Sequence, residues 1–137
     1  MIVSNISEFT ITGILDKGVA NLERIAIFVN QTVNTGQFGV MIGNQPFGHT
    51  QAYPVKDNLL WFGDAILNQG DWIFLYTGSG KVTQTSIEGG KQLYSIYWGK
   101  PQTIFARTDI VPILFKVEAV QIPAMPNDVP QVPPNAL

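Results

Sequence analysis

Short segments with a period of two, and the lack of any long helical pattern, most constrain the fold of this chain. In residues 23–33, Ile25, Ile27, Val29 and Val33 lie on one side of the extended chain, as on a half-buried β-strand. No segment longer than about ten residues shows the period of about 3.6 that an amphipathic helix requires. The chain is therefore predicted to be all-β.

Seven segments of this kind are separated by Gly, Asn, Asp and Pro residues, which favour turns. They are residues 8–15, 23–33, 37–43, 58–63, 71–78, 92–99 and 109–122. Residues 71–78 are apolar on both faces and predict a central strand. Pro112 has no N–H to donate, so it predicts the start, an edge or a bulge of the last strand. About seven short strands with turns between them indicate a β-sandwich or a small barrel.

The C-terminal segment differs in kind from the rest of the chain. Residues 123–137 contain five prolines and one charged residue, and they show no core-forming pattern. This composition is typical of an extended, polyproline-II-like tail or a flexible terminus. The chain is therefore divided into a β-sandwich domain, residues 1–122, and a proline-rich tail, residues 123–137. Docking of the tail on a neighbouring subunit or an aromatic groove is the alternative.

Composition limits the classes of partner. Charged residues make up 13% of the chain, and eight basic residues face ten acidic ones. Electrostatic binding of nucleic acid requires a basic surface, so nucleic acid is not an expected partner. The chain contains no cysteine, which excludes disulfides and thiolate metal sites.

No run of about 18 apolar residues is present, so no membrane partner is expected. The first ten residues lack the basic and apolar regions of a signal peptide. A cytoplasmic location is therefore the default expectation, and an extracellular one stays open if the chain was trimmed.

The segment Gly-Ser-Gly-Lys, residues 78–81, raises the question of a phosphate-binding loop. The motif requires a glycine where this chain has Leu75, and Ser or Thr where it has Val82. The surrounding pattern is also strand-like rather than helical. We therefore expect a hairpin loop in which Gly78 and Gly80 permit positive φ angles.

Residues 66–81 resemble the signature of the lamin-tail family, in which an L-x-P-G turn precedes a strand that ends in T-G-[SG]-G. The matching positions are Leu67, Gly70, Thr77, Gly78, Ser79 and Gly80. Asn68 and Gln69 stand where the family has a residue followed by proline. Residues 23–32 are similar to the family's E-x-[VI]-x-[IL]-x-N strand, with Glu23 and Asn30 one residue further apart than in the pattern.

The resemblance covers about residues 20–122. Phe38 stands at the tryptophan of the family's G-W pair, Trp98, Ile104 and Phe105 fit a later segment, and the closing D-x-x-G hairpin is absent. The family implies an immunoglobulin-like β-sandwich and a non-catalytic interaction module. It also implies that residues 77–80 are a strand-ending turn with no role in phosphate binding.

Residues for catalysis are few. The single histidine, His49, could act as a base for Thr50, and Asp57 is the nearest carboxylate that follows it. Asp57, Asp64 and Asp71 lack the spacing of a calcium loop and are expected to bond local backbone amides instead. No metal and no cofactor is predicted, and the chain is not expected to be an enzyme.

Aromatic residues are dense for a chain with so few charges. Most are expected in the core of a sandwich. Four stand beside Gly or Pro loops and are predicted to form an exposed binding patch: Phe47, Tyr53, Tyr97 and Trp98. The sequence thus favours a non-catalytic protein-interaction or assembly module whose partner is another protein or a second copy of the chain. The alternatives are a carbohydrate-binding module that uses Trp and Tyr faces, and a small hydrolase with a site near His49.

Overall fold

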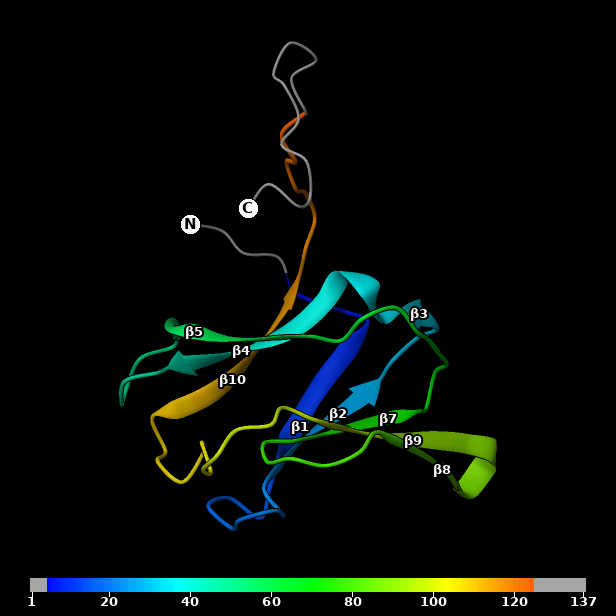
Figure 1. Ribbon diagram of the computed structural model, residues 1–137, viewed down its shortest axis with the longest axis horizontal. Coiled ribbons are helices and arrows are strands. Elements are labelled where there is room, and N and C mark those ends of the chain that lie inside the picture. Colours follow the sequence, from blue (N-terminus) through cyan, green and yellow to red (C-terminus); the bar gives the residue numbers. More distant parts are fainter. Residues whose placement is uncertain (1–4, 125–137) are drawn as a thin grey trace, which may run out of the picture.

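The computed structural model describes residues 5–124, which form two stacked β-sheets (Figure 1). Within these residues there are ten strands: β1 (Phe9–Leu15), β2 (Arg24–Val29), β3 (Val33–Asn34), β4 (Phe38–Asn44), β5 (Tyr53–Trp61), β6 (Ile66–Leu67), β7 (Trp72–Tyr76), β8 (Thr83–Ile87), β9 (Lys91–Tyr97) and β10 (Ile110–Lys116). The predicted all-β sandwich is confirmed, and each of the seven predicted segments overlaps a strand.

The described part of the chain holds two short 3-10 helices, η1 (Thr35–Gln37) and η2 (Glu88–Gly90). Neither has the length or the apolar run that crossing a membrane requires.

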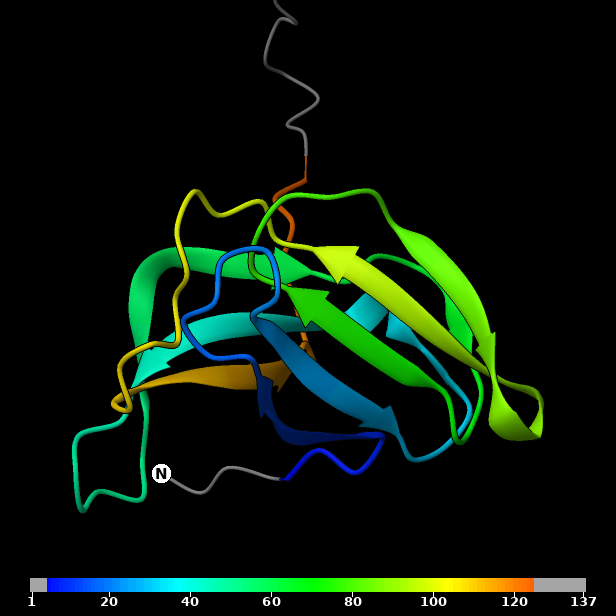
Figure 2. The same ribbon diagram turned by 90° about the horizontal axis from the view of Figure 1, so that it is seen from below.

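The larger sheet has five strands in the order β1-β2-β7-β9-β8, and the smaller sheet has the order β10-β4-β5. β3 and β6 form a separate two-stranded antiparallel pair, in which Val33 lies opposite Leu67. The neighbouring strands pair antiparallel except for β7 and β9, which run parallel (Figure 2). The predicted central strand is confirmed, because β7 lies between β2 and β9.

The core lies between the two sheets and is built by alternation. Ile25, Ile27 and Val29 of β2 point inward, as their spacing predicted, and all three are fully buried. Phe38 of β4 packs against Phe9 of β1 with ring centres 4.8 Å apart and the rings edge to face. This contact joins the small sheet to the first strand of the large one.

The Gly-Ser-Gly segment follows the end of β7, but the prediction of a hairpin loop there is wrong. The segment leads from β7 to β8, and these two strands are not neighbours because β9 lies between them. Neither Gly78 nor Gly80 has a positive φ. A Cβ on Gly80 would instead lie 2.3 Å from Cε1 of Tyr97, so a close approach requires this glycine. Lys81 is followed by β8 rather than by the helix of a phosphate-binding loop.

Pro112 lies on β10, which is an edge strand of the small sheet. An edge position was one of the three alternatives predicted for this proline. Residues 117–124 leave the sandwich from β10 on the small-sheet side (Figure 1). Of the predicted tail, residues 123 and 124 are exposed, and residues 125–137 lie outside the described residues.

Candidate binding surfaces

The outer face of the large sheet is covered by apolar and aromatic side chains. Ile73 and Leu75 are buried in the core, so alternation directs Trp72, Phe74 and Tyr76 to the opposite face. Cross-strand pairing adds residues of β2 and β9 to this face, and Thr12 and Leu15 of β1 and Ile87 of β8 border the same groove. We call the following set the large-sheet face: Thr12, Leu15, Ala26, Phe28, Trp72, Phe74, Tyr76, Ile87, Leu93 and Tyr97. A sheet face that borders water is usually polar, so this face is unusual.

The rings of the large-sheet face pack against one another. Phe28 and Trp72 lie opposite each other on β2 and β7, with ring centres 5.0 Å apart and planes inclined by 28°. Tyr76 and Tyr97 stack in the same way on β7 and β9, also at 5.0 Å. These contacts leave the rings half-buried and gather their apolar surface along β2, β7 and β9. Arg24, Ser95 and Thr85 are polar neighbours on the same face.

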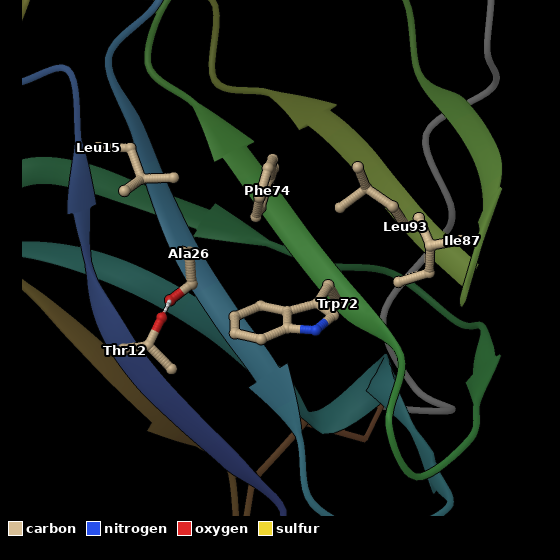
Figure 3. Close-up of a pocket in the computed structure, with 7 residues that line it drawn as sticks. All are labelled: Thr12, Leu15, Ala26, Trp72, Phe74, Ile87 and Leu93. Atoms are coloured by element: carbon tan, nitrogen blue, oxygen red, sulfur yellow. Dashed lines mark hydrogen bonds between the residues drawn. The ribbon is translucent and has the colours of Figure 1, made fainter. Parts of the chain in front are cut away.

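An open groove of about 350 Å³ runs across this face (Figure 3). The Trp72 indole extends from β7 over β2 toward Thr12, and Leu93 and Ile87 form the opposite side. Thr12 sits at a bulge of β1, where it has no residue opposite, and its Oγ1 donates a hydrogen bond to the Ala26 carbonyl oxygen at 3.1 Å. The groove therefore offers apolar contacts and few free hydrogen-bonding groups.

Arg24 is the single charged residue of β1, β2 and β7, and its charge is balanced nearby. Its Nη1 donates to Asp16 Oδ2 at 2.7 Å and to the Leu22 carbonyl oxygen at 2.8 Å. The guanidinium carbon lies 5.2 Å from the centre of the Phe74 ring and 5.6 Å from that of Tyr76. The large-sheet face is thus close to neutral over β1, β2 and β7, whereas Lys91 adds a positive charge where β9 begins, opposite Ile87.

The outer face of the small sheet is also apolar. Phe38 and Val40 of β4 are buried in the core, so Gly39 and Met41 face outward. Pairing places Leu59 and Ile113 beside Met41, and Trp61 and Phe115 beside Gly39. We call Met41, Leu59, Trp61, Val111, Ile113 and Phe115 the small-sheet face. Leu59 and Trp61 are 47% and 48% exposed, which leaves apolar surface in water at the end of β5.

The predicted aromatic patch is divided between distant elements. Phe47 is fully exposed in the loop between β4 and β5, and Tyr53 begins β5. Tyr97 belongs to the large-sheet face, whereas Trp98 packs against the core cluster on the other side of the large sheet. The structure therefore joins Tyr97 with Tyr76 but does not gather the four residues on one surface.

The glutamate of the family-like motif has a structural role. The Glu23 side chain is buried and accepts hydrogen bonds from Gly18 N (2.8 Å), Thr77 Oγ1 (2.9 Å), Ile104 N (2.7 Å) and Phe105 N (3.1 Å). These bonds tie the end of β7 to the long loop before β10. Beyond the end of β7, Gly99 N donates a hydrogen bond to the Gly78 carbonyl oxygen, and Lys100 N donates one to the Thr77 carbonyl oxygen. These bonds join the segments that follow β7 and β9. Ser79 of the same turn is exposed.

Asp71 is buried and confirms the expectation for the loop aspartates in part, because it bonds one local amide and one amide 21 residues away. Its Oδ2 accepts from Asn68 N at 2.8 Å and its Oδ1 from Gln92 N at 3.0 Å. Gly70, just before it, has φ of 90°, which favours glycine. Burial raises the pKa of the Tyr94 hydroxyl, and the negative charge of Asp71 raises that pKa further. Asp71 thus joins the turn before β7 to the start of β9, and neither Asp71 nor Tyr94 lines the groove of the large-sheet face.

The residues considered for catalysis lie apart in the fold. His49 is exposed in the β4–β5 loop, and Asp57 is exposed in the middle of β5 with a positive φ of 63°. In residues 5–124, no three His, Cys, Asp or Glu side chains are grouped to hold a metal ion.

A second hollow, of about 890 Å³ and of mixed polarity, follows β10 beside the start of β1. Lys116 Nζ donates to Glu8 Oε2 at 2.8 Å within it. This hydrogen bond is the main cause that lowers the pKa of Glu8, although burial opposes it. The same bond raises the pKa of Lys116. The ion pair joins the edge strands β1 and β10 of the two sheets.

Comparisons of the chain with protein-family models, curated proteins and solved structures found no match. The resemblance to the lamin-tail family, and with it the immunoglobulin-like topology, therefore stays a prediction.

Proposed function

We propose that this protein is a non-catalytic assembly module that associates with a second copy of itself through the large-sheet face. The observation that carries the proposal is the alternation of β7, which buries Ile73 and Leu75 and still leaves three aromatic residues on the outer side. Burying apolar surface is the main favourable term in protein association. Because Arg24 is paired with Asp16 and Lys91 lies at the edge of the face, its centre carries no net charge that would repel a second copy strongly.

Two further observations support a protein partner. The groove offers apolar lining atoms, and the hydroxyl of Thr12 already donates to a backbone carbonyl. Sugars carry hydroxyl groups that need hydrogen-bond partners when buried, so carbohydrate binding has weaker support. The lamin-tail resemblance favours the same conclusion, since that family is expected to contain interaction modules.

The proposal is tested by light scattering after size exclusion of the full chain and of a Trp72→Lys variant. Trp72 lies on the outer face, so lysine should leave the core intact while placing a charge in the contact. We expect the unaltered chain to have an average mass above the 15.1 kDa of one chain and the variant to be a monomer.

Phe47→Lys is the matched control, because Phe47 is fully exposed but lies on neither face. It should keep the mass of the unaltered chain. Circular dichroism of each variant establishes that it is folded. A Trp72→Lys protein that is folded and keeps the same mass as the unaltered chain would refute the proposed contact.

A further inference from the structure

The geometry points to a head-to-tail assembly in which the large-sheet face of one copy binds the small-sheet face of the next. This inference rests on the proposed self-association and specifies its mode. A symmetric dimer would pair two identical faces, whereas a head-to-tail contact joins two different ones and repeats along the assembly.

The positions of the two apolar faces support this mode. The sheets are stacked, so their outer faces lie on opposite sides of the core (Figure 1). A dimer built on the large-sheet face alone would leave Leu59 and Trp61 about half exposed to water. A head-to-tail contact covers both faces of every internal copy with a single type of interface.

The charges of the faces are compatible with such a contact. The six residues of the small-sheet face are all uncharged. On the large-sheet side, Arg24 is already paired with Asp16. Lys91, which lies opposite Ile87 where β9 begins, adds a cation at the edge of the large-sheet face. The small-sheet face itself would bury no charge, and burying an unpaired charge is the costly event when proteins associate.

The two faces also differ in shape. The large-sheet face has an open groove between Trp72 and Leu93. On the small-sheet face, Trp61 is 48% exposed and meets Phe115 edge to face with ring centres 5.2 Å apart, whereas Met41, Ile113 and Phe115 border the second hollow. An exposed indole is the kind of apolar group that an apolar groove with few hydrogen-bonding groups receives best.

The size of the small-sheet face sets the expected strength. Three strands of about seven residues span roughly 15 by 23 Å, an area of roughly 350 Å². Typical specific interfaces bury roughly 800 Å² per partner, so this contact should be weak. We therefore expect the mean size of the assembly to increase with protein concentration.

A mixing experiment tests the mode of assembly. Trp72→Lys disables the large-sheet face, and Trp61→Lys disables the small-sheet face on an exposed side chain. Each variant alone should sediment as a monomer, since each lacks one half of the contact. An equimolar mixture should form a one-to-one dimer that grows no further, because each copy then has one intact face.

The alternative outcomes are distinct. If Trp61→Lys keeps the mass of the unaltered chain while Trp72→Lys is a monomer, the contact is symmetric, and the head-to-tail inference is overturned but self-association stands. If the unaltered chain is a monomer at every concentration, both proposals fail. Leu93→Lys and Leu59→Lys repeat the test on the same faces if either first variant does not fold.

Discussion

Trp61 and Phe115 contact each other edge to face across β4, with ring centres 5.2 Å apart, although they lie on the two outer strands of the small sheet. The residue between them is Gly39. A Cβ at this position would lie 2.5 Å from Cζ of Phe115 and 2.3 Å from the carbonyl oxygen of Leu60. The absence of a side chain at Gly39 thus permits the contact between the two rings.

Gly39→Ala should therefore destabilise the fold. The backbone carbonyl of Leu60 cannot move aside easily, so we expect a loss of about 1–3 kcal/mol in the free energy of unfolding, measured in urea. Gly78→Ala is the control, because its Cβ would have an ordinary nearest contact of 3.5 Å and its φ is not positive. Equal stability of the two variants would show that the contact at Gly39 is not tight.

Glu23→Gln should be severely destabilising. The carboxylate accepts four hydrogen bonds from buried or part-buried donors, and an amide would present N–H groups to some of them. Leaving buried donors unpaired costs about 1–3 kcal/mol each, so we expect a loss of at least about 3 kcal/mol on thermal or urea unfolding. The exposed Glu88 gives the control Glu88→Gln. A Glu23→Gln protein as stable as this control would remove the proposed structural role.

Stability should fall in acid partly through Glu8. Its pKa in the folded state lies below the ordinary value of 4.5, mainly because Lys116 donates a hydrogen bond to it. The contribution of this bond is therefore present above pH 4.5 and is lost as the pH falls through the lowered pKa. In a series of melting temperatures from about pH 6 to pH 2, Glu8→Gln should show a weaker pH dependence than the unaltered chain.

Glu118 provides the comparison for this experiment. It lies 3.7 Å from Lys116 Nζ and its side chain is 78% exposed, so Glu118→Gln should change the acid dependence much less. Identical acid profiles for the Glu8 variant and the unaltered chain would contradict the role given to the Glu8–Lys116 pair.

Glycans should leave the tryptophan fluorescence unchanged. Trp72 and Trp61 lie on the two apolar faces, and Trp98 packs against the core. We expect titration with soluble oligosaccharides to produce no saturable quenching, because the groove lacks free hydrogen-bonding partners. Saturable quenching that Trp72→Lys abolishes would favour carbohydrate binding over assembly.

Much of the fold follows from alternation in the sequence. The inward positions of Ile25, Ile27 and Val29 were predicted from their spacing, and the central place of β7 from its apolar character on both faces. β8 was missed because Thr83, Gln84, Thr85 and Ser86 are polar and show no apolar face. Its position beyond β9 depends on a parallel pairing of β7 with β9, and pairing between distant segments leaves no local signal.

The candidate surfaces were predicted less well. Proximity to loops selected Tyr97, which lies on the large-sheet face, but also Trp98, which packs on the core. Most aromatic residues were expected in the core, and Trp72, Phe74 and Tyr76 were not singled out as surface residues. Their common parity, opposite to Ile73 and Leu75, is a signal in the sequence that places all three rings on one face. Which of the two faces is inward depends on the second sheet and is decided by tertiary packing.

The measurement that tests the central claim most directly is sedimentation equilibrium of the unaltered full chain, from micromolar to millimolar concentration. Self-association through the apolar faces predicts an average mass that rises with concentration above the 15.1 kDa of one chain. A mass that stays at 15.1 kDa over the whole range would contradict it.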